Sequence, residues 1–196
     1  MTRIANAFLA LVALLAAATL QACFPLAATG LATTALMIED RRTTGIYIED
    51  ENIEWKTLAR TREKFKDVHL NATSFNLTVL LTGEVPTEQL KNEIAEVVRG
   101  IPSVKSVTNE IAIAGSSSLT SRGNDTLITS NVKARLFGNG RVSPAHVKVV
   151  TENGVVYLMG IVTQQEGDAA ADVARTASGV GRVIKVFEYI AQAPKR

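Results

Sequence analysis

The sequence is poor in the residues that build disulfide frameworks, metal centres and nucleic-acid surfaces. Cys23 is the only cysteine, so no disulfide can form within one molecule. There are two histidines, His69 and His146, and because neither has another histidine or cysteine nearby, we expect exposed strand-edge residues and not metal ligands. A formal net charge of +2 over 196 residues is too small for a nucleic-acid footprint. The sequence therefore predicts no cofactor, no metal and no nucleic-acid partner.

Candidate catalytic residues are equally few. Glu166, Asp168 and Asp172 cluster near the C-terminus, but a solvated helix face explains them better than a paired acid and base. Trp55, the only tryptophan, is interpreted as a half-buried core residue. These residues do not predict an enzyme.

A strong β-hairpin pattern is present at 147–160, in the stretch VKVVTENGVVYLMG. Asn153 and Gly154 supply the two positive-φ positions of a type I′ turn, with β-branched or aromatic residues on both sides. A weaker copy, HLNATSFNLTVLLTG, places Gly83 77 positions before Gly160. The chain is therefore predicted to be a tandem repeat, and a repeated small module without catalytic residues is more often a binding device than an enzyme.

The N-terminal 22 residues have the pattern of a lipoprotein signal peptide, with Arg3 followed by an apolar Ala/Leu-rich stretch. It ends in LQAC, which resembles a bacterial lipobox, and we expect Cys23 to carry the lipid anchor, with acyl chains such as palmitate. Phe24, and not Asp, follows the cysteine, which resembles lipoproteins sent on to the outer membrane. Two alternatives remain: an ordinary signal peptide with an incidental thiol, and a membrane-spanning helix over residues 4–38.

The repeat predicts an α+β protein with two modules. Each module is expected to follow the order αββαβ, with a three-stranded mixed sheet packed on two helices. We expect helices at 53–66, 88–99, from a cap at Asp125 or Thr126 to 137, and 166–177, and strands at 68–75, 77–83, 105–113, 146–151, 155–160 and 182–190. The predicted segments are a signal peptide (1–22), an apolar tether and linker (23–49), the first module (50–114), a linker (115–124), the second module (125–191) and a tail (192–196).

The two modules resemble BON domains. The resemblance rests mainly on Asn124-Asp125-Thr126, on VKVVTENGVVYLMGIVT, on the Ala169-Ala170-Ala171 helix and on Ser178-Gly179-Val180. With a lipobox and an apolar tether in front, the chain is similar to outer-membrane lipoproteins with tandem BON domains. The resemblance implies a non-catalytic lipoprotein on the periplasmic side of the outer membrane, which supports envelope integrity at the division site. It also implies binding to an anionic phospholipid membrane through the first helix of the second BON domain.

The residues of that helix are consistent with a membrane face. At 100° per residue, Ile128, Val132 and Leu136 form one buried stripe, and a second side carries an apolar and basic set. Residues 125–196 also have a net charge of +3, against −2 for residues 50–114, which favours an anionic surface. The predicted phospholipid-binding residues are Leu127, Ser130, Lys133, Ala134, Arg135, Phe137 and Arg141.

Two alternatives to this membrane face stay open at the level of sequence. Leu127 and Phe137 would be buried if they packed against the first module or against the loop before Val142. The second alternative is a different function, a periplasmic adaptor that uses the same modules to dock on outer-membrane assembly or cell-wall remodelling machinery.

Overall fold

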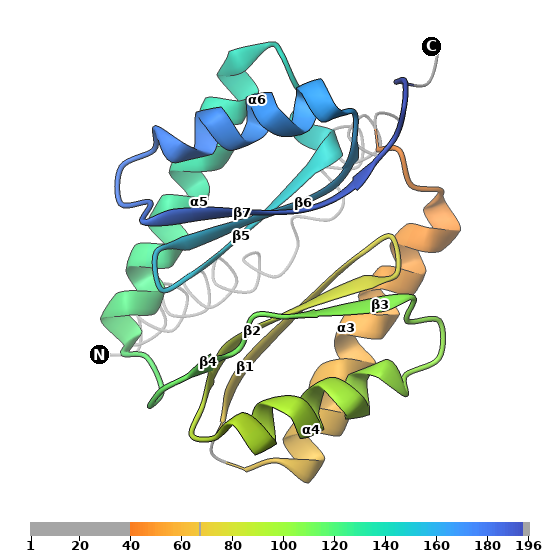
Figure 1. The fold of residues 1–196 in the computed structure, drawn as a ribbon, viewed down its shortest axis with the longest axis vertical. Helices are drawn as coiled ribbons and strands as arrows, with labels where there is room; N and C mark the ends of the chain where they lie inside the picture. The colour runs from red at the N-terminus through yellow and green to blue at the C-terminus, as the bar shows by residue number, and fades with distance from the viewer. Residues whose placement is uncertain (1–39, 67, 194–196) are drawn as a thin grey trace, which may run out of the picture. The chain divides into compact units, whose positions relative to one another are not determined.

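The computed structural model describes residues 40–66 and 68–193 (Figure 1). The chain divides into two units, Met1–Ile38 and Glu39–Arg196, and the described residues belong to the second. The predicted signal peptide and its lipobox residue Cys23 lie outside the described residues. Within the described ranges, no helix combines the length and the apolar character needed to cross a membrane.

The first module has the predicted αββαβ order. It consists of α3 (Thr44–Lys64), β1 (His69–Phe75), β2 (Thr78–Val85), α4 (Glu88–Arg99), β3 (Ser106–Asn109) and β4 (Ala112–Ile113). Strand β2 pairs antiparallel with β1 and parallel with β3 and β4, so the sheet is mixed as expected.

The second module repeats this order. It consists of α5 (Leu119–Asn139), the short 3₁₀ helix η2 (Pro144–His146), β5 (Val147–Glu152), β6 (Val155–Val162), α6 (Gln164–Arg175) and β7 (Arg182–Tyr189). Strand β6 is central, antiparallel to β5 and parallel to β7. The predicted fold class is confirmed in both modules.

The first helix of each module begins earlier than predicted. Helix α3 begins at Thr44, where the Thr43 side chain accepts a hydrogen bond from the Ile46 N–H, and α5 begins at Leu119 with Ser118 as its N-cap. Parts of the predicted linkers 23–49 and 115–124 are therefore helical. The apolar periodicity marked only the part of each helix that packs on its sheet, and capping side chains mark the true start.

The last strand of the first module is interrupted, and does not run continuously over 105–113. Between β3 and β4 the backbone N–H of Ile111 turns toward the Asn109 side-chain oxygen, at 3.3 Å. The Ile111 side chain is buried in the core of the module. We attribute the interruption to this burial, because the side chain leaves the regular alternation of the strand.

Central strands β2 and β6 are buried on both faces. Alternate residues of each strand face the helices of their own module, and the others face the second sheet. Between the two sheets lies an apolar cluster of Phe75, Leu80, Tyr157 and Met159. Packing of the two helix-free sheet faces therefore joins the modules.

Two repeated glycines are required by close backbone approach. A Cβ atom at Gly83 would lie 2.1 Å from the His69 carbonyl oxygen, and one at Gly160 would lie 2.2 Å from that of His146. No side chain fits at these distances, which explains why the glycines recur 77 positions apart.

Each hairpin turn is held by a buried aspartate of the first helix. Asp125 was predicted as a helix cap, but it lies within α5 and accepts hydrogen bonds from the backbone N–H groups of Asn153 and Gly154, both at 2.8 Å. Both turn residues have positive φ, 49° and 72°, so the predicted type I′ turn is confirmed. A buried carboxylate thus fixes the turn to the helix.

The first module uses the same contact with a less favourable turn. Asp50 of α3 accepts from the N–H groups of Asn76 and Leu77, both at 2.8 Å. Leu77 has φ of 66°, a left-handed conformation that costs a non-glycine residue about 1 kcal/mol or more. The hydrogen bonds to Asp50 offset this strain.

Two adjacent arginines connect the start of the described chain to both modules. Arg41 binds Glu166 of the second module through two hydrogen bonds of 2.8 Å and donates to the Ile161 carbonyl at 2.8 Å. Arg42 binds Asp50 of the first module at 2.9 Å and stacks on the Phe75 ring, 3.9 Å from its centroid. The predicted linker is therefore fixed to the folded unit at these residues.

The aspartate contact predicts a large loss of stability for Asp125→Ala. Two backbone N–H groups would lose a charged acceptor, at about 1–3 kcal/mol each, so the free energy of unfolding should fall by about 2–4 kcal/mol. Urea unfolding followed by circular dichroism measures this. Asp172→Ala, an exposed aspartate of α6, serves as the control and should change stability by less than about 0.5 kcal/mol. An unchanged midpoint for Asp125→Ala would show that the turn is stable without the helix.

The Arg41–Glu166 contact predicts acid-sensitive stability. Hydrogen bonds from Arg41 are the main cause that lowers the pKa of Glu166 from 4.5 to about 2. Since the folded-state pKa is depressed, this contribution is complete above about pH 4.5 and is lost as the pH falls toward 2.

The measurement is urea unfolding of Glu166→Gln and wild type across this pH range. The variant should be less stable by about 1–2 kcal/mol near neutral pH, and the difference should shrink steadily in acid. Asp172→Asn is the matched control on the same helix and should show the wild-type pH dependence. A Glu166→Gln difference that stays constant with pH contradicts the assignment.

Candidate functional site

Helix α5 places its core residues on one side. Ile128, Val132 and Leu136 are buried against the sheet and α6, as predicted, and Asp125 lies in the same stripe. These four positions fall within about 80° around the helix axis at 100° per residue. The opposite side of α5 is therefore left outside the core.

That opposite side is apolar and exposed. Leu127 is 70% exposed and Phe137 is 78% exposed. The alternative in which both residues pack against the first module or the loop before Val142 is therefore wrong. Leu119, in the first turn of the helix, is 83% exposed. It was missed because α5 was predicted to begin near Asp125, although Ser118 could have signalled the earlier start.

The three exposed apolar side chains share one face along the length of the helix. At 100° per residue, Leu119, Leu127 and Phe137 fall within about 80° of one another. With a rise of about 1.5 Å per residue, Leu119 and Phe137 are separated by about 27 Å along the axis. We refer to Leu119, Leu127, Ser130, Ala134 and Phe137 as the outer face of α5.

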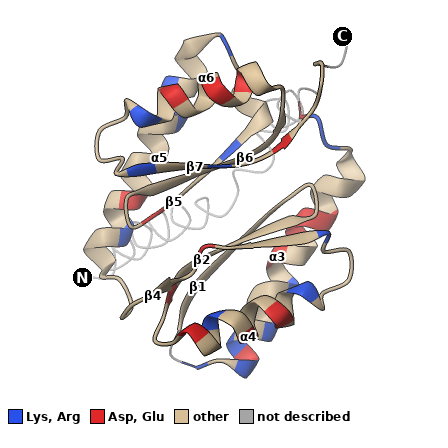
Figure 2. Ribbon diagram, viewed as in Figure 1, with Lys and Arg blue, Asp and Glu red and all other residues tan. Residues whose placement is uncertain are grey.

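Basic residues flank the outer face. Lys133 is exposed, and no described carboxylate lies within 4.0 Å of it. Arg135 donates to Asn131 at 3.1 Å and to Thr176 at 3.3 Å, so its charge is held at the surface, and no acidic side chain of the described residues pairs with it. The one acidic residue of α5 is the buried Asp125, against three basic ones, which gives the helix a positive surface (Figure 2).

The remaining predicted residues are also at the surface. Ser130 donates its hydroxyl to the Thr126 carbonyl at 2.9 Å, and Ala134 is exposed beside it. Arg141 follows the helix, is exposed and donates to Asn139 at 3.1 Å. All seven predicted phospholipid-binding residues are therefore solvent-accessible, and six of them lie on α5.

The first module carries a second exposed apolar face. Trp55 of α3 is 76% exposed, so its interpretation as a half-buried core residue was wrong. Ile48 lies two turns earlier on the same side and is also exposed. The reason is the buried stripe of α3, which consists of Asp50, Ile53 and two threonines and leaves Trp55 on the outside.

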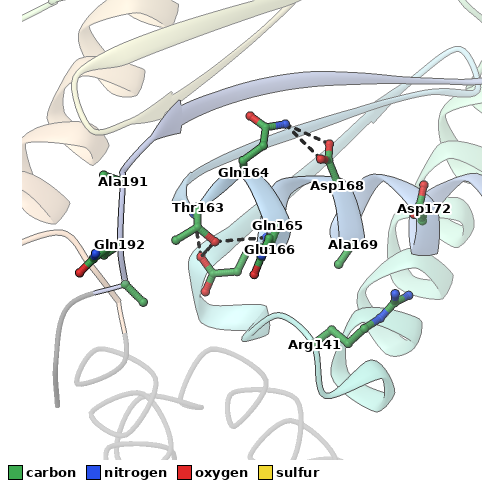
Figure 3. A pocket seen from close by; sticks show the side chains of 11 residues that line it. Arg141, Thr163, Gln164, Gln165, Glu166, Asp168, Ala169, Asp172, Ala191 and Gln192 are labelled. Carbon is green, nitrogen blue, oxygen red and sulfur yellow. Dashed lines mark hydrogen bonds between the residues drawn. The ribbon is translucent and has the colours of Figure 1, made fainter.

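A cleft beside α6 collects the acidic residues that were considered for catalysis (Figure 3). Glu166 forms a capping box with Thr163 and binds Arg41, Asp168 pairs with Lys185 at 2.9 Å, and Asp172 pairs with Arg175 at 2.8 Å. Each of these carboxylates has a structural partner. Asp168 and Asp172 form surface ion pairs, as expected of a solvated helix face. Glu166 differs, because it caps the helix and binds Arg41.

Both histidines are less exposed than predicted. His69 lies 2.7 Å from the Glu84 carboxylate, and its side chain is 14% exposed. His146 lies in η2, 3.8 Å from Glu166, with 11% of its side chain exposed. The strand ends that carry them are covered by neighbouring elements, which the sequence pattern did not show.

Comparison with known proteins follows the same division of the chain. A family model for the BON domain matches residues 50–115 and 124–191. The outer membrane lipoprotein DolP of Haemophilus influenzae is 38% identical over 174 residues, which cover 87% of this chain and 90% of that protein.

Two further relatives are similar over most of their lengths. The 21 kDa hemolysin of Actinobacillus pleuropneumoniae is 33% identical, covering 77% of this chain and 79% of that protein. The osmotically-inducible protein Y of Escherichia coli is 31% identical, covering 71% of this chain and 72% of that protein. With two matched modules of αββαβ order, the chain belongs to the BON-domain family as a tandem-BON protein of the DolP type.

Proposed function

We propose that the protein is a non-catalytic lipoprotein of the outer membrane, facing the periplasm, that binds anionic phospholipid through the outer face of α5. The observation that carries this proposal is the exposure of Leu119, Leu127 and Phe137 on one side of a helix with basic flanks. We further propose that this binding supports outer-membrane integrity at the division site. The similarity to DolP supports the outer-membrane assignment.

Apolar burial would supply most of the binding free energy. A helix that lies in the membrane interface inserts its apolar side chains to the level of the acyl chains and keeps its polar side in water. Full burial of a leucine or phenylalanine side chain contributes about 1.5–3 kcal/mol. Three such side chains spread over five turns would hold α5 parallel to the membrane surface.

The basic residues would select anionic lipid. A lysine or arginine near an anionic leaflet contributes about 1 kcal/mol, and this contribution weakens with salt. Lys133 is the strongest candidate because no described acidic side chain competes with lipid phosphate for it. Arg135 and Arg141 already donate to neighbouring side chains and keep further N–H groups for phosphate.

Covalent attachment would come from Cys23. Each buried acyl methylene contributes about 0.8 kcal/mol, so several chains hold a protein permanently at a membrane. Binding by α5 would then set the orientation of the modules on the lipid surface and would not be needed for attachment.

Protein docking is the second candidate function, and α3 is the observation that favours it. Trp55 and Ile48 present an exposed apolar face on a helix whose four basic residues are balanced by five acidic ones, unlike those of α5. Tryptophan is enriched at the centres of protein interfaces. An adaptor that docks on envelope assembly or cell-wall remodelling proteins would use this face, and it would be insensitive to lipid charge.

The membrane proposal predicts that Leu127→Ser with Phe137→Ser weakens liposome binding at least tenfold with little change in stability. Both side chains are already exposed, so their removal costs the fold little, whereas each loses up to about 1.5–3 kcal/mol of burial in lipid. Sedimentation with vesicles of graded anionic content measures the affinity. Adding Leu119→Ser should weaken binding further.

The matched control is Ile48→Ser with Trp55→Ser, which removes the exposed apolar pair of α3. This control should bind vesicles as the wild type does. If it loses binding while the α5 variant keeps it, the membrane surface lies on the first module. No sedimentation of the wild type at any lipid composition would favour the adaptor.

Lipid attachment predicts that Cys23→Ser releases the protein from membranes. The serine hydroxyl does not replace the thiol as an acceptor for the lipid, so a fraction of the chain should appear as a soluble form after cell fractionation. A high-salt wash before the comparison removes the electrostatic part of the binding through α5. A variant that stays in the membrane with its precursor uncleaved would indicate a membrane-spanning signal anchor.

A further inference from the structure

A polar cluster lies between the two sheets, on their helix-free faces. His69 and Glu84 stand opposite each other in the β1–β2 ladder, and Glu152 ends β5. The Nδ1 atom of His69 lies 2.7 Å from Glu84 Oε2 and 4.0 Å from Glu152 Oε1. One ligand-type atom from each of the three residues lies within 4.8 Å of the other two. Two residues come from the first module and one from the second.

The cluster buries more negative than positive charge. Glu84 is 2% exposed and Glu152 is 7% exposed. Among the described residues, His69 is the one basic side chain within 4.0 Å of either carboxylate. Even a protonated His69 would leave one negative charge unbalanced, and a buried unbalanced charge is strongly unfavourable. A bound cation would remove this imbalance.

Glu84 accepts hydrogen bonds from several neighbouring groups. Burial alone would raise the pKa of Glu84, but hydrogen bonds from His69, the Asn153 side chain and the Ser117 N–H lower it below the usual value of 4.5.

Neighbouring side chains hold both carboxylates and leave one oxygen of each toward His69. Glu152 Oε2 accepts from Asn71 at 2.8 Å and from Thr82 at 3.2 Å, while Oε1 is the atom nearest His69. Glu84 Oε1 accepts from Asn153, while Oε2 faces His69 and also accepts from the Ser117 N–H at 3.2 Å. Hydrogen bonds of this kind from a second layer of residues orient the ligands of metal sites.

The second module shows that the fold does not require these charges. The positions 77 residues from Glu84 and Glu152 are Ile161 and Phe75, and both belong to the apolar cluster between the sheets. The other half of the same interface is thus built from apolar side chains, which generally stabilise a buried contact at least as well as ion pairs. Packing therefore does not explain why a histidine and two glutamates stand here.

We propose that His69, Glu84 and Glu152 bind one divalent transition-metal ion of the zinc class, and that the ion clamps the two modules together. One imidazole and two carboxylates are a zinc donor set, and water would complete four-coordination. Ligand atoms on one tetrahedral ion lie about 3.3 Å apart, and the three atoms here already lie within 4.8 Å of one another, so side-chain shifts of about 1–2 Å suffice. Glu152 lines a cleft of about 260 Å³, and His69 lines another of about 270 Å³.

The test is a calorimetric titration of Zn²⁺ into the full chain carrying Cys23→Ser, without an affinity tag and in a buffer free of chelators. The serine removes the only thiol, which would otherwise compete for zinc. We expect one Zn²⁺ per chain and a rise in the melting temperature, since a ligand that binds only the folded state stabilises it.

Three variants and one control assign the ligands. Glu84→Gln and Glu152→Gln keep the shape of the side chains and should each weaken zinc binding at least about tenfold, and His69→Gln should weaken it by about 100-fold. His146→Gln is the matched control, at the equivalent position of the repeat, and should leave the affinity within about twofold of the Cys23→Ser protein. Circular dichroism without metal confirms that each variant is folded.

The proposal is overturned if the Cys23→Ser protein shows no saturable binding, or if binding survives in Glu152→Gln. Loss of binding in His146→Gln alone would likewise overturn it and place the zinc site elsewhere. If His69→Gln does not fold, the two glutamine variants of the glutamates decide the question, because they retain the histidine and the side-chain volumes.

Discussion

The hydrogen bonds between a buried helix aspartate and a hairpin turn set the geometry of each module. Asp125 in α5 and Asp50 in α3 each accept two backbone N–H groups of a turn, and this fixes how far each helix is rotated about its axis. A shift of one residue along α5 would rotate every side chain by about 100°. Such a rotation would bring Leu127 toward the core and remove Ile128 from it. The outer face of α5 is therefore exposed because Asp125 holds the helix in register.

The second constraint is burial of β2 and β6 on both faces. Each strand contributes alternate side chains to the core of its own module and the remaining ones to the contact between the sheets. Half of that contact is apolar, around Phe75 and Tyr157, and the other half holds His69 and the two glutamates. The modules are repeats in fold, yet the two halves of their contact differ in chemistry.

The local patterns that fixed the fold could be predicted from the sequence. The Asn153-Gly154 turn and the stripe of Ile128, Val132 and Leu136 gave the hairpin, the helix and the order of elements, because they depend on residues close in the chain. The start of α3 was missed because the buried residue in its first half is the polar Asp50, which apolar periodicity does not detect.

Contacts between residues far apart in the chain could not be predicted from the sequence either. The sequence left open whether Leu127 and Phe137 are buried or exposed, and the structure shows that both are exposed. Nothing near His69 in the chain indicates Glu152, because the approach of two carboxylates to one histidine depends on how the sheets pack. The prediction of exposed histidines failed for the same reason.

If the N-terminus is tethered as proposed, the neighbouring arginines Arg41 and Arg42 have a mechanical consequence. Because Arg41 is bound to the second module and Arg42 to the first, tension along the chain would be divided between two separate groups of hydrogen bonds. A pull through α3 alone would peel the first module open from one end. When the load reaches both modules at once, the hydrogen bonds of the two arginines are loaded together in shear. The two modules would then follow the movement of the membrane as one body.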